Sequence, residues 1–391
     1  ISLGINVIDL DLSTTPTVEL MVKEYNADGG IIITASHNPT EWNALKLLDE
    51  NGEFLNSVEG EKIIDISESK KFIFSNVHEL GKIYKSNDSM KKHIECVLNL
   101  NLVDVEKIKS KKIKVVVDAV NSTGGLIVPD FLEELNIEVI KLYCEPNGDF
   151  PHNPEPLKKN LTELSKKVIE CNADLGIAVD PDVDRLVFVC EDGELFGEEN
   201  TLVACADYVL SKTPGSTVSN LSSSRALNDI TKKHNQVHYY SAVGEVNVVD
   251  KMKKCKAVIG GEGNGGVIYP KSHYGRDSIV GIGLFLSLYV ERGLIASKLL
   301  ETYPKYFMVK EKINLSPSLD VDNILGQIAE KYKNENIDLV DGVRIDFKDS
   351  WVQLRKSNTE PIIRIYSEAK SNDKASELIK EIEILIKNII S

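Results

Sequence analysis

The sequence predicts an α/β protein that ends in a smaller α+β domain, and three observations support this prediction. Short runs rich in valine and isoleucine alternate with segments of helical periodicity over most of the chain, which is typical of α/β layers with mostly parallel sheets. From about residue 306 several strands follow one another between helices, which indicates an antiparallel sheet. The chain has 391 residues, which is too long for one compact core and suggests about two to four domains.

Each expected element follows from a local pattern. Runs of β-branched and other apolar residues predict strands at 30–37, 112–118, 175–179, 186–190, 257–261, 310–315, 341–347, 351–355 and 362–369. Longer segments of helical periodicity predict helices at 128–135, 201–212, 278–293, 322–334 and 373–389. These patterns place the domains at 1–90, 91–197, 198–305 and 306–391.

Charge and composition limit the classes of function. The formal charge is −14, which argues against duplex nucleic acid or an anionic membrane as the main partner. An acidic protein can still hold a phosphorylated small molecule where arginine, lysine and a cation line one site. The six cysteines form no CxxC pair, no apolar run is long enough to span a membrane, and no secretion signal is visible. The expected location is therefore the cytoplasm, with reduced cysteines.

A turn of small residues, TASHNP at 34–39, contains Ser36 and is stopped by Pro39. This serine turn lies at the end of a strand, where α/β sheets bind ligands. Serine is a poor nucleophile unless a neighbour activates it or it already carries the group to be transferred. A Ser-His hydrolase is disfavoured, because His37 should point to the opposite face of the strand and no GxSxG elbow is present. A purely structural turn is the alternative. Lys46, ten residues further on, could reach the same site as Ser36.

Asp180, Asp182 and Asp184 alternate in a turn between two apolar strands, and we call residues 180–185 the aspartate loop. Alternation puts the three carboxylates on one side, where they would repel one another without a cation. Oxygen ligands, few in number and near a phosphate, favour Mg²⁺ over Ca²⁺. The spacing also resembles an EF-hand, but that motif needs glycine at Arg185 and flanking helices. The remaining alternative is an acidic turn without metal, in which Arg185 pairs with an aspartate.

GEGNGG at 261–266, the glycine loop, fits the spacing of a dinucleotide fingerprint. That fingerprint must open a helix, whereas VIYP here predicts a short strand. We expect instead a close approach of the backbone to a polyol, with Glu262 accepting hydrogen bonds from two neighbouring hydroxyls and Asn264 assisting. A flexible turn is the alternative.

A basic turn, RKSNTEPIIR at 355–364, separates the last two expected strands. Its guanidinium groups, hydroxyls, amide and backbone N–H groups suit a phosphate dianion. A hairpin with surface arginines is the alternative. The candidate phosphate-binding residues are Arg355, Ser357, Asn358, Thr359 and Arg364.

Taken together and in this order, the four segments resemble those of the α-D-phosphohexomutase superfamily, and the resemblance covers essentially the whole chain. It implies four domains around a central cleft: three related α/β domains with mixed sheets and a fourth, α+β domain. It also implies a phosphate on Ser36 in the active enzyme and one Mg²⁺ bound by that phosphoserine and the three aspartates. The implied catalytic residues are Ser36, His37, Lys46 and Arg185, and the implied sugar-binding residues are Glu262 and Asn264.

The implied reaction interconverts a hexose 6-phosphate and a hexose 1-phosphate. Phosphoserine donates its phosphoryl group to the sugar, a 1,6-bisphosphate forms, and the serine takes back the other phosphate. Hexose 1,6-bisphosphate is then the activator. The motifs favour glucosamine phosphate, with glucose or mannose phosphate as the alternative. An inactive sugar-phosphate-binding homologue and a Mg²⁺-dependent phosphatase remain open.

The chain departs from the family pattern at several positions. Pro181 stands where the aspartate loop usually has glycine, and Gly266 stands where many relatives have histidine. Glu245 and Ser222 replace a histidine and a lysine of some relatives, which leaves the general base open. Relatives also begin with a further segment that carries an arginine-bearing loop. By this resemblance the beginning of the first domain is expected to be missing, either because the sequence is incomplete or because the protein is a truncated form.

Overall fold

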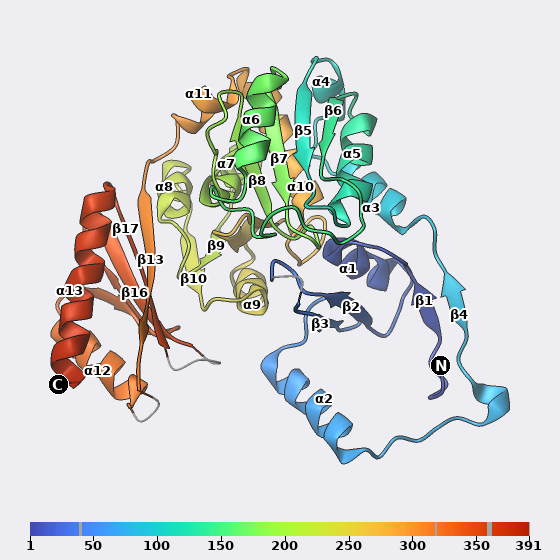
Figure 1. Cartoon of the computed structure of the whole chain (residues 1–391), viewed down its shortest axis with the longest axis horizontal. Helices are drawn as coiled ribbons and strands as arrows, with labels where there is room; N and C mark the ends of the chain where they lie inside the picture. Colours follow the sequence, from blue (N-terminus) through green and yellow to red (C-terminus); the bar gives the residue numbers. More distant parts are fainter. Residues whose placement is uncertain (39–40, 317–318, 358–361, 391) are drawn as a thin grey trace.

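The computed structural model describes residues 1–38, 41–316, 319–357 and 362–390. It confirms the α/β architecture, and Figure 1 shows four successive regions. The strands of the C-terminal region lie on one side, those of the N-terminal region on the other, and the second and third regions lie between them (Figure 1). Within the described residues no helix combines the length and apolarity that a membrane span requires.

The first region contains two small sheets. The strands β2 (Gly30–Thr34) and β3 (Ala44–Leu48) are antiparallel, while β1 (Val7–Asp9) and β4 (Ile83–Lys85) are parallel. The prediction of a buried strand near residue 30 is wrong for one face: Ile32 is buried, but Ile31 and Ile33 are 65% and 71% exposed. Side chains alternate along β2, and only the face with Ile32 packs against Val22 of α1. The helices of this region are α1 (Thr15–Glu24), α2 (Ser57–Ser69) and the 3₁₀ turn η1 (Val77–Glu79).

The second and third regions share one topology. The second has the sheet order β6-β5-β7-β8 and the third has β10-β9-β11-β12. In each, three strands are parallel and the last pairs antiparallel through a short hairpin. The strands are β5 (Lys114–Asp118), β6 (Glu138–Leu142), β7 (Leu175–Val179), β8 (Leu186–Cys190), β9 (Thr217–Asn220), β10 (His238–Ser241), β11 (Ile259–Glu262) and β12 (Gly266–Ile268). The related α/β domains are thereby confirmed.

Helices cover these two sheets. In the second region they are α3 (Ser89–Leu98), α4 (Val105–Lys109), α5 (Gly124–Glu134) and α6 (Thr162–Glu170). In the third they are α7 (Glu198–Lys212), α8 (Ala226–Lys233), α9 (Glu245–Cys255), α10 (Ser278–Arg292) and α11 (Ala296–Leu300).

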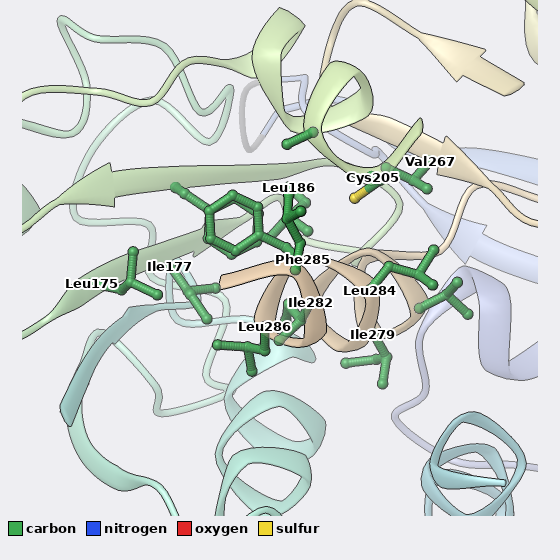
Figure 2. Packing of buried hydrophobic residues seen from close by; sticks show 14 of the residues in the cluster. Leu175, Ile177, Leu186, Cys205, Val267, Ile279, Ile282, Leu284, Phe285 and Leu286 are labelled. Atoms are coloured by element: carbon green, nitrogen blue, oxygen red, sulfur yellow. The ribbon is translucent and has the colours of Figure 1, made fainter. Parts of the chain in front are cut away.

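The helix α10 lies at the centre of a hydrophobic core that joins the second and third regions. It is apolar on all sides, as expected for a helix without a solvent-facing stripe. Phe285 stacks on Phe188 of β8 with ring centroids 3.7 Å apart, and Ile282, Leu284 and Leu286 project from other sides of the same helix (Figure 2). Each such buried side chain contributes about 1.5–3 kcal/mol. The hairpins of both sheets are therefore held by one continuous core.

The C-terminal region is the expected α+β domain. Its antiparallel sheet has the order β13-β17-β16-β15-β14, and helices pack on it around a separate apolar cluster. The elements are β13 (Phe307–Asn314), α12 (Val321–Lys331), β14 (Asn336–Asp338), β15 (Val343–Asp346), β16 (Ser350–Lys356), β17 (Ile362–Ala369) and α13 (Asn372–Ile390). The strand at 362–369 was predicted to the residue.

Candidate active site

The serine turn, the aspartate loop and the glycine loop occupy equivalent places in the first three regions. Each connects two neighbouring antiparallel strands: β2 to β3, β7 to β8, and β11 to β12. Contacts join the three hairpins. The amide of Leu186 donates to the Gly265 carbonyl at 3.1 Å, and Lys46 of β3 donates to the aspartate loop.

The aspartate loop turns through Val183, whose φ of 66° is left-handed and strained for a β-branched residue. Asp180 Oδ1 accepts hydrogen bonds from the amides of Asp184 and Arg185, at 3.1 and 3.0 Å. This folding brings one ligand atom of each aspartate within 4.8 Å of the others. Pro181 is compatible with the loop, because its carbonyl accepts from Ser122 and Thr123 and the missing N–H is not required there.

In each of the three carboxylates, one oxygen accepts hydrogen bonds and the other accepts none from the described residues. Asp182 Oδ2 accepts from the Thr15 hydroxyl at 2.6 Å and from Lys46 Nζ at 2.6 Å. Asp184 Oδ2 accepts from Lys46 Nζ at 3.0 Å. By contrast, Asp180 Oδ2, Asp182 Oδ1 and Asp184 Oδ1 are buried and accept no hydrogen bond from any residue that the structure describes. Buried oxygens without donors are costly unless a cation binds them, so this donor set fits a hard divalent ion.

The charges around the loop shift its acid–base behaviour. Burial and the repulsion from Asp184 and Asp182 hold the pKa of Asp180 well above its ordinary value. Burial alone would also raise the pKa of Asp184, but the positive charges of Arg276, Lys46 and Arg185 outweigh it and lower that pKa. The repulsion felt by Asp180 is what a bound cation would relieve.

The serine turn corrects one inference from the sequence. The strand β2 ends at Thr34, and Ser36 has a left-handed φ of 50°. Ser36 Oγ therefore lies 3.3 Å from Nδ1 of His37, although alternation along a strand would have placed the two side chains on opposite faces. The turn, and not the strand, decides their direction.

The surroundings of His37 nevertheless argue against a hydrolase. Its Nε2 lies 3.3 Å from Nη2 of Arg185, and a guanidinium can only donate. Nε2 is thus the acceptor, so the proton of the neutral ring is on Nδ1 and points to Ser36 Oγ. Burial and the charge of Arg185 lower the pKa of His37, which keeps the ring neutral. His37 is placed to donate a hydrogen bond to Ser36 and not to remove its proton.

In the glycine loop, Glu262 is held by protein donors. Oε1 accepts from Asn220 at 2.7 Å and from the Gly244 amide at 3.1 Å. Oε2 accepts from Arg276 at 3.0 Å and from Asn264 at 3.5 Å. A carboxylate offers about four acceptor positions, so a ligand hydroxyl would displace the longest of these contacts, that of Asn264. The short strand β12 after the loop confirms that this is not a dinucleotide fingerprint.

In the basic turn, register places three cationic residues side by side. Arg355 on β16 faces Arg364 on β17, and Arg364 faces Lys312 on β13. Like charges directly opposite each other are destabilising, which favours an anion on this face. Arg355 Nε also lies 2.7 Å from Oδ2 of Asp341. The amide of Ser357 donates to the Ile362 carbonyl at 3.1 Å, and the predicted ligands Asn358 and Thr359 lie outside the described residues.

Sequence reasoning missed three residues of this site. Arg276 contacts both the aspartate loop and the glycine loop, Thr15 binds Asp182, and Lys312 extends the basic row. Lys312 could have been found by aligning the expected strands 310–315 and 362–369. Nothing in the sequence around Thr15 or Arg276 distinguishes them from surface residues.

Two positions that depart from the family pattern also have defined contacts. Glu245 accepts from the Nε of Arg276 at 2.8 Å. Ser222 donates to Gln353 of the C-terminal sheet at 2.7 Å, so it helps to join the third and fourth regions.

Comparison with known proteins agrees with this geometry. The chain matches the phosphoglucomutase/phosphomannomutase α/β/α domains I, II and III at residues 1–74, 91–193 and 198–306, and the C-terminal domain of the same family at 314–385. It is 38% identical to a phosphoglucomutase/phosphomannomutase of Thermococcus kodakarensis over 384 residues, or 97% of this chain and 83% of that protein. It is 33% identical to a probable phosphoglucosamine mutase of Methanopyrus kandleri, over 99% of this chain and 85% of that protein.

Solved structures show the same fold. A phosphoglucomutase/phosphomannomutase family protein of Burkholderia thailandensis superimposes with a TM-score of 0.85 at 23% identity, covering 99% of this chain and 84% of that chain. An Aspergillus fumigatus N-acetylphosphoglucosamine mutase, solved with GlcNAc-6P and magnesium, superimposes with a TM-score of 0.60 at 14% identity, covering 96% and 92% of the two chains. The chain therefore belongs to the phosphoglucomutase/phosphomannomutase family and is a mutase of the α-D-phosphohexomutase superfamily.

Proposed function

We propose that this mutase interconverts hexose 6-phosphate and hexose 1-phosphate through a phosphoserine at Ser36, with glucosamine phosphate as the preferred substrate. The observation that carries the proposal is the aspartate loop. Each of its three carboxylates has one buried oxygen that accepts no hydrogen bond from a described residue, and one oxygen of each lies within 4.8 Å of the others. His37 and Arg185 connect that loop to the serine turn, and Lys46 connects it to the neighbouring strand β3. We place the limits of the four domains near residues 90, 197 and 305.

We assign one Mg²⁺ to Asp180, Asp182 and Asp184, together with a phosphate oxygen on Ser36. The three oxygens without hydrogen bonds support this assignment, one of them, Asp180 Oδ2, lying 3.9 Å from Arg185 Nε, as does the magnesium in the structure of the distantly related Aspergillus enzyme. When bound, the ion supplies positive charge for the phosphoryl oxygens. Thr15 and Lys46 hold the outer oxygen of Asp182, which orients its inner oxygen.

In the proposed transfer, the bond between phosphorus and Ser36 Oγ breaks as a bond forms to a hydroxyl oxygen of the sugar. The sugar hydroxyl loses its proton to a base that we do not assign, and Ser36 Oγ is the leaving oxygen. The Nδ1–H of His37 points to that oxygen and stabilises the charge it acquires. Lys46, which contacts Asp182 and Asp184, and Arg185, which contacts His37, supply further positive charge around the metal site and the serine turn.

The substrate would lie between the glycine loop and the basic turn. We assign its sugar hydroxyls to Glu262 and Asn264. Its non-reacting phosphate would bind the basic turn, through Arg355, Ser357, Asn358, Thr359 and Arg364. A fixed clamp on one phosphate aligns the other end for in-line attack. Hexose 1,6-bisphosphate, the intermediate, would restore the phosphoserine and so act as activator.

The choice of sugar rests on the sequence patterns, because curated relatives carry both names, phosphoglucosamine mutase and phosphoglucomutase/phosphomannomutase. A coupled assay with Mg²⁺ and a trace of glucose 1,6-bisphosphate should compare the 1-phosphates of glucosamine, glucose and mannose. We expect glucosamine 1-phosphate to be converted to its 6-phosphate fastest. Faster conversion of another sugar would overturn the substrate assignment. Release of inorganic phosphate without isomerised product would indicate a phosphatase, and binding without turnover would indicate an inactive homologue.

A further inference from the structure

We propose that Arg276 is a positioning residue that couples the metal site to the sugar site by holding both in one hydrogen-bonded fork. The proposal rests on the roles assigned above to the aspartate loop and the glycine loop. It concerns a residue to which neither the sequence motifs nor the proposed mechanism gives a part.

The fork joins three carboxylates from three separate segments. Nη2 of Arg276 donates to Asp184 Oδ2 at 2.7 Å, and Nη1 donates to Glu262 Oε2 at 3.0 Å. Nε donates to Glu245 Oε2 at 2.8 Å, and the backbone amide of Arg276 donates to the other oxygen of Glu245 at 3.0 Å. The arginine is only 8% exposed, so these charges interact with little screening by water.

Only arginine can make this arrangement. Its planar group presents donors in fixed directions, whereas the ammonium of lysine is a single point of charge on a flexible stem. A lysine at this position could neutralise one carboxylate but could not fix the directions of three. Asp184 and Glu262 would then be free to turn independently.

The backbone of Arg276 is itself fixed. The next residue, Asp277, caps the N-terminus of the central helix α10, with its Oδ1 accepting from the amides of Ile279 and Val280. Asp277 Oδ2 lies 2.9 Å from His93 Nε2 and 3.1 Å from His273 Nε2. The fork is therefore anchored on the same core that carries both hairpins.

The glycine loop leaves space for the arginine stem. A Cβ atom on Gly266 would lie 2.3 Å from Cδ of Arg276, closer than such atoms ever approach. Gly266 belongs to the strand β12 and its φ is not left-handed, so the backbone conformation itself would accept alanine. The main obstacle to alanine at 266 is therefore the contact with Arg276. Gly266 and Arg276 thus form a matched pair, in which the arginine occupies the volume that a side chain at 266 would take.

The fork explains how one site can influence the other. Arg276 and Lys46 hold Oδ2 of Asp184, which leaves Oδ1 for the metal. The same arginine holds Oε2 of Glu262, the carboxylate assigned to the sugar. A cation on Asp184 and a sugar on Glu262 therefore act on one guanidinium, and the two binding equilibria should be linked reciprocally.

The test measures Mg²⁺ binding by isothermal titration calorimetry, without turnover, in the full chain. The variants are Arg276→Lys, Gly266→Ala, Arg276→Ala and the double variant Arg276→Ala/Gly266→Ala. Arg292→Lys is the control, because Arg292 lies at the other end of α10, is partly exposed and pairs with the buried Asp207 of α7. We expect Arg276→Lys and Gly266→Ala each to weaken Mg²⁺ binding by about 10- to 100-fold, as outer-shell substitutions do. Arg292→Lys should leave it unchanged.

Two further readouts separate coupling from general damage. In the wild type, saturating Mg²⁺ should tighten the binding of glucosamine 6-phosphate, and in Arg276→Lys this enhancement should disappear. In the background of Arg276→Ala, Gly266→Ala should cost much less than it does alone, because the clashing Cδ atom is absent and only Asn264 Oδ1, 3.1 Å from the added Cβ, stays close. Thermal unfolding of each variant shows whether it is folded.

Unchanged Mg²⁺ affinity in Arg276→Lys, or additive effects of Gly266→Ala and Arg276→Ala, would overturn the proposal. If the arginine variants do not fold, Gly266→Ala alone must weaken Mg²⁺ binding, and a normal affinity in that variant refutes the coupling. These measurements need no catalysis. A wild type that binds Mg²⁺ and sugar phosphate but does not isomerise the sugar would contradict the proposed function. The Mg²⁺ affinities of the Arg276 and Gly266 variants would still test the coupling between the metal site and the sugar site.

Discussion

The geometry around His37 makes a prediction that separates two chemical roles. If His37 were the general base for Ser36, its removal should cost about 10²–10⁴ in rate. If it donates a hydrogen bond from Nδ1, as its contact with Arg185 requires, the loss should be that of one hydrogen bond. Because the oxygen acquires charge in the transfer, such a bond contributes about 1.5–3 kcal/mol, or a factor of about 13 to 160 in rate.

Two substitutions divide the contacts of this histidine. His37→Asn keeps an N–H near the position of Nδ1 and so keeps the donor to Ser36. His37→Gln keeps an acceptor near the position of Nε2 and so keeps the partner of Arg185. We expect His37→Asn to retain most of the turnover in the coupled hexose 1-phosphate assay, and His37→Gln to lose about 13- to 160-fold.

The pH dependence supplies an independent check. Burial and Arg185 lower the pKa of His37 below its ordinary value, so the ring stays neutral above about pH 6.5. The turnover number should therefore show no titration of His37 between pH 6.5 and 9. A loss of a hundredfold or more in both variants, accompanied by the disappearance of a titration in that range, would refute the donor role and restore His37 as a base.

Three further predictions follow from other parts of the site. Ser36→Ala should abolish turnover while sugar-phosphate binding, measured by calorimetry, stays within a few-fold; near-normal rates would end the phosphoserine mechanism. Arg364→Ala should raise KM by about 10-fold or more with little change in kcat. Lys312→Gln should raise KM by a smaller factor, because lysine cannot bind a phosphate through two parallel N–H groups as arginine does. Unchanged KM in both variants would show that the basic turn does not bind the substrate phosphate. Burial alone would lower the pKa of His273, but hydrogen bonds to Asp277 and Glu19 raise it to about 10. A raised pKa in the folded state means that stability is complete below about pH 6.5 and is lost as pH rises toward 10. The free energy of unfolding should therefore fall over that interval by on the order of 5 kcal/mol more in the wild type than in His273→Gln; parallel curves would contradict this.

The parts of the fold that could be predicted are those that local pattern determines. The strands at 175–179 and 186–190 are buried on both faces and read as continuous apolar runs, and the structure has them at those residues. The aspartate loop between them was predicted to gather three carboxylates, and it does. In the strand near residue 30 the same kind of apolar run gave a wrong expectation, because Ile31 and Ile33 are exposed. Hydrophobicity alone does not say which face of a two-stranded sheet is covered.

The parts that could not be predicted depend on contacts between distant segments. Arg276 lies 92 residues from Asp184 and 31 from Glu245, and only the packing of α10 brings them together. The side chains of Ser36 and His37 were placed wrongly, because one residue with a positive φ replaces strand alternation by a turn. The equivalence of the three hairpin loops also emerges only from sheet order. Motifs therefore supplied the candidate ligands of the site, and the structure added residues that contact those candidates.

The phosphoserine mechanism can be tested by following a labelled phosphoryl group through the protein. The protein is incubated with glucose 1,6-bisphosphate carrying radiolabelled phosphoryl groups, the labelled residue is identified by peptide mass spectrometry, and the labelled protein is then mixed with unlabelled glucosamine 6-phosphate. We expect label on Ser36 alone, followed by its transfer to the sugar and the appearance of labelled hexose phosphate. Label on another residue, or its release only as inorganic phosphate, would rule out the phosphoserine mutase mechanism.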